Sequence, residues 1–273
     1  MCILFIYRDP KADCHSFRLI VISNRDEVLN RPAKPAHYWE KHPHCLGGTD
    51  MEPGKEGGTW LALSTKGQAG AILTLSGESK HSQTPKEGRG FLVADYVTSD
   101  ESCETYLNKL YQIDRQTEKY NPYTLVLFEL ANANVRWLSS PSDMKAPQTS
   151  EEKILGFGNS PFDQPYKKVQ VGKETFEILV KNASVKDQQQ LIQNLLEFLK
   201  CSDRHLPDEE LRKRSPEFYP ALSSIFVQSE TKTYGTRTHS ILLVDGTGRI
   251  TFIEETLMPD ESWKRQQFQT HLQ

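Results

Sequence analysis

The chain has no long apolar run, no block of basic residues and no pair of closely spaced cysteines. A membrane-crossing helix needs about 20 consecutive apolar residues, so we expect no transmembrane segment. The formal net charge is −3, and without a basic strip we expect no nucleic-acid partner. The first apolar run stops at Arg8-Asp9-Pro10, which disfavours a secretory signal. We therefore expect a cytoplasmic protein.

The sequence also lacks a convincing cofactor motif. Its five cysteines are odd in number and scattered (Cys2, Cys14, Cys45, Cys103 and Cys201), which favours free thiols in a reducing compartment. The segment His42-Pro43-His44-Cys45 could contact a metal, but a structural zinc site needs four ligands. The glycine-bearing stretches 54–59 and 246–249 do not open helices, as a phosphate loop would. We predict turns there, a solvated loop at 42–45, and neither a metal nor a nucleotide cofactor.

Hydrophobic patterning predicts an α+β chain. Strands are expected at 2–7, 17–23, 59–64, 70–75, 123–130, 135–140, 154–160, 239–245 and 249–255, and helices at about 89–99, 102–116, 171–183, 186–200 and 260–273. Residues 28–58 and 76–88 are expected to be connections. The strands are nearly continuous apolar runs joined mostly by hairpins, which indicates cover on both sheet faces. Two stacked sheets with outer helices, a four-layer αββα sandwich forming one domain over 1–273, fit this order.

The first strand begins at Cys2. If Tyr7 pairs with Arg18, Cys2 falls opposite Ser23, and residues 24–27 return to the N-terminus. Once Met1 is removed, the α-amino group of Cys2, with a reference pKa of about 7.7–8.0, can take the proton of its own thiol.

An N-terminal nucleophile also needs groups that hold the amine and stabilise an oxyanion. Suitable residue types stand at predicted strand ends: Arg25, Asp26, Asn159 and Arg237. The alternatives are structural. Cys2 would then be a small buried apolar residue, Arg25 and Asp26 a buried salt bridge, and His239 a core histidine.

Three segments resemble the NRDE-motif family, whose animal members are called transport and Golgi organization protein 2. They are SNRDEVLNRPAKPAHYW at 23–39, GGTWLALSTKGQAGAILT at 57–74 and YGTRTHSILLVDGTGRITF at 234–252. The resemblance implies an αββα fold similar to that of the N-terminal-nucleophile hydrolases. It matches Cys2 to the nucleophile, Asn24, Arg25, Asp26 and Glu27 to the family motif, and Asn159 to a polar oxyanion donor. Many relatives have Asn where this chain has Leu75, and losing one such donor costs about a hundredfold or more in rate.

The family resemblance also implies a function. Its leading form is haem trafficking, with haem or an acyl-CoA or lipid cargo held by Cys2, Asn24, Arg25, Asp26, Glu27, Arg237 and His239 and passed to haem-accepting proteins. Association with mitochondria or the Golgi is a further expectation. The axial ligand of haem stays open among Cys2, His15, His37, His42, His44, Cys45 and His239. The alternative is an amide C–N hydrolase with Cys2 as nucleophile and Arg25, Asp26 and Asn159 assisting. A third is a non-catalytic interaction protein with an exposed apolar patch.

Overall fold

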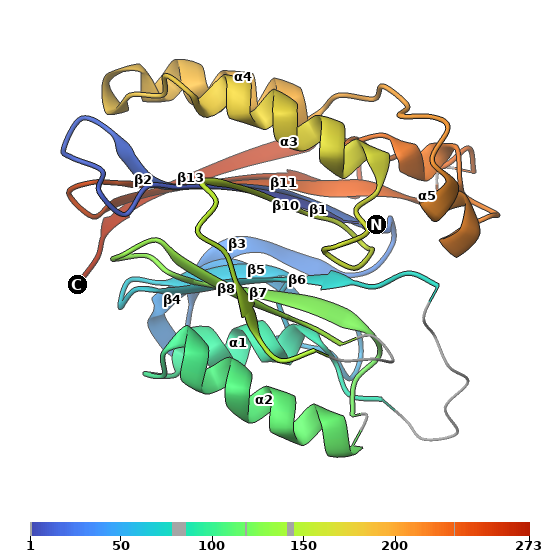
Figure 1. Ribbon diagram of the computed structural model, residues 1–273, viewed down its shortest axis with the longest axis horizontal. Coiled ribbons are helices and arrows are strands. Elements are labelled where there is room, and N and C mark those ends of the chain that lie inside the picture. The colour runs from blue at the N-terminus through green and yellow to red at the C-terminus, as the bar shows by residue number, and fades with distance from the viewer. Residues whose placement is uncertain (1, 78–85, 118, 141–144, 232) are drawn as a thin grey trace. The chain divides into compact units, whose positions relative to one another are not determined.

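A computed structural model describes residues 2–77, 86–117, 119–140, 145–231 and 233–273. The chain divides into two compact units (Figure 1). The first combines residues 1–30 with 152–272, and the second combines 31–151 with Gln273. Each unit is a sheet with helices on one face, and each is described by itself below.

The first unit is built on a six-stranded antiparallel sheet. Its strands, in spatial order, are β10 (Ile154–Phe157), β1 (Ile3–Arg8), β2 (Phe17–Val28), β11 (Tyr234–Asp245), β12 (Arg249–Leu257) and β13 (Trp263–His271). Helices α3 (Lys167–Val180) and α4 (Gln188–Leu199) cover one face of this sheet (Figure 1). The short helix α5 (Glu209–Arg214) and two 3-10 turns, Val185–Asp187 and Ala221–Ser223, complete the unit.

The core of this unit lies between the helices and alternate residues of the central strands. Ile3 and Phe5 of β1 pack with Ile20 and Ile22 of β2 against α3 and α4. The apolar stripe predicted for the second helix, Leu191, Leu195, Leu196 and Leu199, belongs to this cluster. The intervening residues of β1 and β2 are buried as well, as their continuous apolar sequence predicts.

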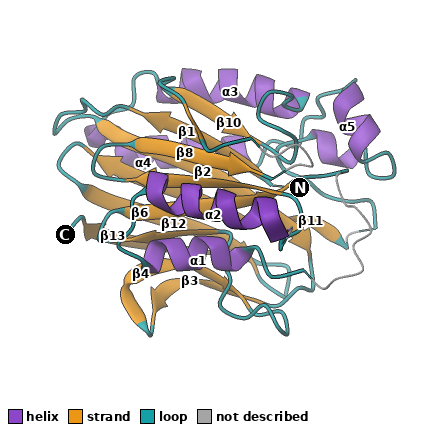
Figure 2. Cartoon of the chain, turned by 60° about the horizontal axis from the view of Figure 1, so that its bottom comes forward, coloured by secondary structure: helices purple, strands orange, loops and turns teal. Residues whose placement is uncertain are grey.

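The second unit has a seven-stranded antiparallel sheet. Its order is β3 (Ala33–Trp39), β4 (His42–Asp50), β5 (Leu61–Ser64), β6 (Gln68–Thr74), β7 (Tyr123–Glu129), β8 (Asn134–Ser139) and β9 (Gln148–Thr149). Helices α1 (Gly90–Thr98) and α2 (Cys103–Thr117) run side by side over its strands (Figure 2). Tyr96 and Tyr106 join the two helices, with ring centroids 5.3 Å apart.

The predicted register of the first hairpin is wrong by two residues. Tyr7 pairs with Ile20, not Arg18, and Ile3 pairs with Asn24. A slip of two residues keeps every side chain on its face of the sheet, so the apolar pattern could not distinguish the two registers. The observed register brings the residues after Ser23 closer to the start of β1.

Four further elements differ from the prediction. The segment 28–58, expected as a connection, contains β3 and β4, and His42-Pro43-His44-Cys45 opens β4. Prolines in both strands obscured their pattern. Within residues 260–273, expected as a helix, Trp263–His271 form the edge strand β13. This strand is largely exposed and polar, so no apolar period reveals its pairing with β12. Helix α5 was not predicted. Within the expected connection 76–88, residues 78–85 lie outside the described residues.

The α+β class is confirmed, and each unit supplies one sheet layer and one helix layer. The prediction of a single domain stays a prediction. In the part of the chain that the structure describes, no helix combines the length and apolarity needed to span a bilayer.

Candidate functional site

Cys2 directly precedes β1, between the ends of two neighbouring strands. Ile3 pairs with Asn24 of β2, and Leu4 pairs with Phe157 of β10. Continuing these registers sets Cys2 opposite Arg25 on one side and opposite Asn159 on the other. Directly opposed residues of antiparallel strands share a face of the sheet. Strand pairing therefore gathers three of the four predicted catalytic residues into one row.

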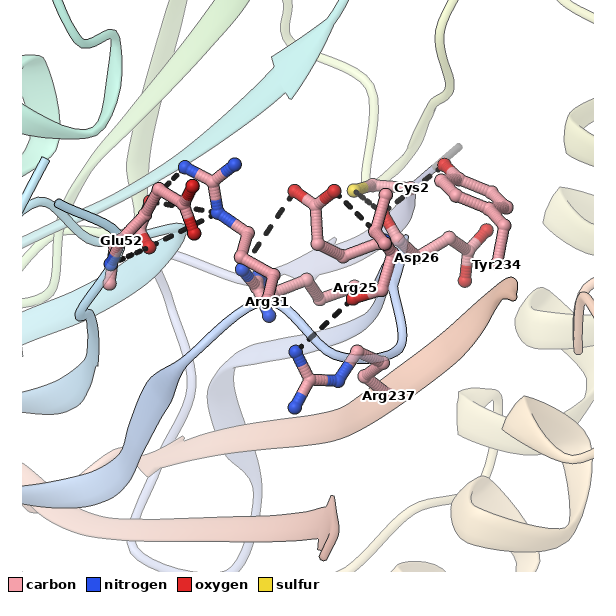
Figure 3. Close-up of polar contacts among 10 residues, drawn as sticks. Cys2, Arg25, Asp26, Arg31, Glu52, Tyr234 and Arg237 are labelled. Carbon is pink, nitrogen blue, oxygen red and sulfur yellow. Dashed lines mark hydrogen bonds and ion pairs between the residues drawn. The ribbon is translucent and has the colours of Figure 1, made fainter. Parts of the chain in front are cut away.

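The thiol of Cys2 lies against the backbone of Asp26, the fourth predicted catalytic residue. Its Sγ lies 3.9 Å from the carbonyl oxygen of Asp26 (Figure 3). The same oxygen accepts a hydrogen bond from the Tyr234 hydroxyl at 3.2 Å. Burial raises the pKa of the Cys2 thiol, and the nearby charge of Asp26 raises it further. The side chain is therefore a protonated thiol at neutral pH.

Asp26 is a buried residue, only 5% exposed. Its Oδ1 accepts a hydrogen bond of 2.6 Å from the Thr236 hydroxyl, whose oxygen in turn accepts the backbone N–H of Val227 at 2.8 Å. Burial raises the pKa of Asp26, while the positive charge of Lys168 acts in the opposite direction. Asp26 thus joins β2, β11 and the segment before β11.

Two buried arginines lie at the same strand end (Figure 3). Arg25 forms an ion pair with Glu27 at 3.9 Å. Arg237 occupies an irregularity in the pairing of β11 with β2, and its Nη1 donates to the Val28 carbonyl at 3.4 Å. A guanidinium group can bind a carboxylate or phosphate through two parallel hydrogen bonds. This end of the sheet therefore offers cationic groups suited to an anionic ligand.

Asn24 and His239 face the helices. They pair across β2 and β11 in the row of Ile3, so alternation places them on the opposite face from Cys2 and Arg25. The Asn24 amide donates to the carbonyls of Leu199 at 2.8 Å and Ile225 at 2.9 Å. These contacts give Asn24 and His239 a structural role. Their role in ligand binding stays a prediction.

The ring of His239 is enclosed. Its Nδ1 lies 2.7 Å from Oδ1 of Asn24. The ring stacks on Trp263 with centroids 4.6 Å apart and lies 5.8 Å from Phe226. Burial lowers the pKa of His239 to about 3, so the imidazole is neutral at neutral pH.

The remaining predicted residues are placed as follows. Asn159 follows β10 and is fully buried, and its backbone oxygen accepts the Tyr166 hydroxyl at 3.3 Å. Leu75 is a buried apolar side chain just after β6 of the second unit. Cys45, also in the second unit, donates to the Val97 carbonyl, and burial raises the pKa of its thiol to about 11. Among the described residues no cluster of metal-ligand side chains occurs.

Lys168 is a residue of this region that sequence reasoning missed. It is the second residue of α3 and is fully buried. The helix was predicted to start at 171, which left Lys168 outside it. The available signal is the four-residue spacing of Lys168, Gly172, Phe176 and Val180, which places all four on the buried stripe of α3.

Comparison with known structures agrees with the fold. The C2A mutant of conjugated bile acid hydrolase from Clostridium perfringens has a TM-score of 0.50 and 8% identity, covering 100% of this chain and 92% of that one. This likeness concerns the fold alone, and it confirms the predicted resemblance to the N-terminal-nucleophile hydrolases.

Sequence comparison identifies the family. Transport and Golgi organization protein 2 of Drosophila melanogaster is 36% identical over 100% of this chain and 98% of its own length. The Homo sapiens homolog is 31% identical over 100% of both chains. The family model described as Transport and Golgi organisation 2 matches residues 1–259. The chain therefore belongs to the Transport and Golgi organisation 2 family.

Proposed function

We propose that this protein is an intracellular haem carrier that also accepts acyl-CoA or another acyl lipid, and that it binds its cargo where β1 and β2 meet. The observation that supports this proposal is that a protonated thiol, Cys2, lies at the same end of the sheet as buried guanidinium groups. Haem and acyl-CoA share an apolar body and anionic groups. Arg25 and Arg237 suit the carboxylates of the first and the phosphates of the second.

The protonated thiol favours a carrier that releases its cargo. The thiolate, not the thiol, is the strong metal ligand, and burial keeps Cys2 in the thiol form. Cys2 would then hold haem iron weakly. His239 is a poorer axial candidate, because one ring nitrogen faces Asn24 and the ring lies against Phe226 and Trp263.

Haem titration followed by absorbance tests this proposal. The wild-type protein should shift the Soret band at micromolar concentration and transfer haem to an apo-acceptor. Cys2→Ala should change the band position and weaken binding, whereas Cys14→Ala, at an exposed free cysteine, should leave both unchanged. Arg237→Gln should weaken binding about tenfold, since it removes one charge-assisted hydrogen bond. No Soret shift and no transfer would end the haem proposal.

A second candidate function is hydrolysis of an amide bond. The row of Asn159, Cys2 and Arg25 favours it, because it sets a nucleophile between an amide and a guanidinium that could stabilise an oxyanion. The C2A substitution in a hydrolase of the same fold also supports it. The sulfur would attack the carbonyl carbon, the amine would leave with a proton, and water would cleave the resulting thioester. The base would be the α-amino group of Cys2, after removal of Met1.

Intact mass and thiol labelling test this second candidate. A hydrolase should lack Met1 and should label faster at Cys2 than at the buried Cys103. It should also release product from a fluorogenic acyl amide, and Cys2→Ala should abolish that release. Retention of Met1 in the native protein, or slow labelling of Cys2, would exclude the mechanism.

The proposed carrier works in the cytoplasm and delivers haem to acceptor proteins at mitochondria or the Golgi. The family name supports the Golgi connection, and the five free cysteines suit a reducing compartment. Fractionation of cells that express the tagged chain should recover it with the cytosol and with one of these organelles. Recovery from the secretory lumen would contradict this part of the proposal.

A further inference from the structure

The ammonium group of Lys168 is a charge buried inside the first unit. Its side chain is 0% exposed, and Nζ donates to the Ser224 carbonyl at 3.0 Å. A buried ammonium is costly unless an opposite charge lies nearby. Asp26 provides the strongest such interaction, followed by Cys2 and Asp208. Asp208 already accepts the backbone N–H groups of Lys167 and Leu211, so Asp26 is the main electrostatic partner of Lys168.

A four-residue segment, 224–227, also links the two side chains. Lys168 holds its first carbonyl, at Ser224, and the Asn24 amide holds the next, at Ile225. At the other end Val227 exchanges hydrogen bonds with Thr236. Its N–H donates to the Thr236 hydroxyl oxygen, and its carbonyl accepts the Thr236 backbone N–H, both at 2.8 Å. That hydroxyl donates to Asp26. Lys168 is thus connected to Asp26 by charge and through this segment.

We propose that Lys168 is a positioning residue of the Cys2 site, which holds segment 224–227 in place and thereby the Thr236 hydroxyl that donates to Asp26. The inference rests on the proposed function of that site and deepens it. Lys168 acts on the site through Asp26, whose carbonyl oxygen contacts the Cys2 sulfur.

The charged groups around Lys168 come from each element packed against it. β2 contributes Asp26, Cys2 stands just before β1, and the segment before α5 contributes Asp208 and His205. Lys167 is its neighbour on α3. Without the ammonium, burial favours the neutral form of Asp26. Without Lys168 the pKa of Asp26 would rise further, so the carboxyl would take up its proton at a higher pH in the folded state.

Urea unfolding between pH 5 and pH 9 tests this inference with Lys168→Met, Asp26→Asn and the double variant. The urea midpoint of Lys168→Met should fall below that of the wild type. The gap should widen as the pH rises, because the folded state resists losing the Asp26 proton. The double variant should be no less stable than either single variant, since both buried charges are then gone. Lys168→Arg, which keeps the charge, should restore the wild-type pH dependence.

Lys167→Met is the matched control. It makes the same change at the adjacent position, where the residue is only partly buried and Nζ donates to the Leu206 carbonyl. Its midpoint should follow the wild type at every pH. Additive losses from Lys168→Met and Asp26→Asn with no pH dependence would overturn the inference.

If Lys168→Met does not fold, the unfolding of Asp26→Asn alone tests the inference. Its deficit relative to the wild type should grow as the pH falls from 9 to 6, because the buried amine of Lys168 resists protonation once the charge of Asp26 is gone. A constant deficit would overturn the inference. Haem titration of the folded variants then reports on the site. Weaker binding by Lys168→Met than by Lys168→Arg supports the positioning role, and equal binding overturns it. Absence of haem binding by the wild type contradicts the proposed function and leaves the unfolding result standing.

Discussion

Asn24 of β2 and His239 of β11 are joined side chain to side chain, with 2.7 Å between Oδ1 and the imidazole Nδ1. The two amide hydrogens of Asn24 go to backbone carbonyls at Leu199, the last residue of α4, and Ile225. One buried side chain therefore connects two strands, a helix end and the segment before β11. The first residue of the family motif stabilises the fold next to the later motif residues of the candidate site.

Asn24→Ala should lower the free energy of unfolding by about 3 kcal/mol or more. The substitution leaves two buried carbonyls and one imidazole nitrogen without their partner, and each unsatisfied buried group costs about 1–3 kcal/mol. Urea unfolding at pH 7 measures this loss. Asn182→Ala, at an exposed position after α3, is the control and should change the free energy by about 0.5 kcal/mol or less. Equal stability of the two variants would contradict the structural part assigned to Asn24.

The low pKa of His239 should make the protein less stable in acid. Burial lowers the pKa from 6.5 to about 3, and the charge of Lys200 adds to this effect. Below about pH 6.5 the unfolded chain binds a proton at this residue and the folded chain does not. The free energy of unfolding should therefore fall by about 1.4 kcal/mol per pH unit between about pH 6.5 and pH 3 from this residue.

His239→Gln removes that titration, so its unfolding free energy should depend less on pH in the same window. His271→Gln, at an exposed histidine, should keep the wild-type dependence. NMR titration of the His239 ring gives a direct check. A ring that titrates near pH 6.5 in the folded protein would show that Trp263 and Phe226 do not exclude water from it.

The sequence predicted those parts of the fold that have a strong apolar period. The stripe of α4 and the continuous runs of β1 and β2 were correctly predicted, because burial on one or both faces selects the residue types at each position. β13 could not be predicted in this way. Its residues are mostly exposed, so the strand is determined by backbone pairing with β12. Its side chains show no apolar pattern from which a strand could be predicted.

The grouping of Cys2 with Arg25 and Asp26 was predicted for a similar reason, and their role as a site stays a prediction. Cys2, Arg25 and Asp26 follow from their places at the ends of two strands that form a hairpin. Lys168 comes from a helix about 140 residues later along the chain. Its burial depends on the packing of α3 on the sheet, which brings the ammonium into the electrostatic range of Asp26. The four-residue spacing on α3 marks Lys168 as buried, but no local pattern shows that Asp26 is its electrostatic partner.

Glu255 should stabilise the protein above acid pH through two ion pairs. Its nearly buried carboxylate lies 2.7 Å from Nζ of Lys200 and 2.8 Å from Nη2 of Arg265. Burial alone would raise the pKa of Glu255, but hydrogen bonds from both cations outweigh this effect and lower it below 4.5. The stabilisation is therefore present above about pH 4.5 and is lost as the pH falls through the lowered pKa.

Glu255→Gln should lower the free energy of unfolding at pH 7 by about 1–3 kcal/mol, the range for charge-assisted hydrogen bonds. The difference from the wild type should disappear in acid, below the lowered pKa. Glu217→Gln, at an exposed position, is the control for the change in net charge. An equal loss of unfolding free energy at pH 7 and pH 3 would show that the loss does not come from the ion pairs.

Gly172 should not tolerate alanine, although it lies within α3. An alanine in a helix normally stabilises by about 0.5–1 kcal/mol relative to glycine. At this position the added Cβ would lie 2.4 Å from Cζ of Phe5. The Phe5 ring has little room to move, because it stacks on Phe176 at 5.8 Å and contacts Phe198 at 5.5 Å.

Gly172→Ala should therefore lower the free energy of unfolding by about 1–3 kcal/mol, the usual cost of overpacking a core. Phe5→Leu shortens the side chain below Gly172, so the double variant should be more stable than the sum of the single effects predicts. Glu174→Ala, at an exposed position on the same helix, controls for helix propensity. Urea unfolding of the wild type, the two single variants and the double variant gives the coupling free energy between positions 5 and 172. A gain in stability from Gly172→Ala alone would mean that α3 packs farther from β1 than these contacts require.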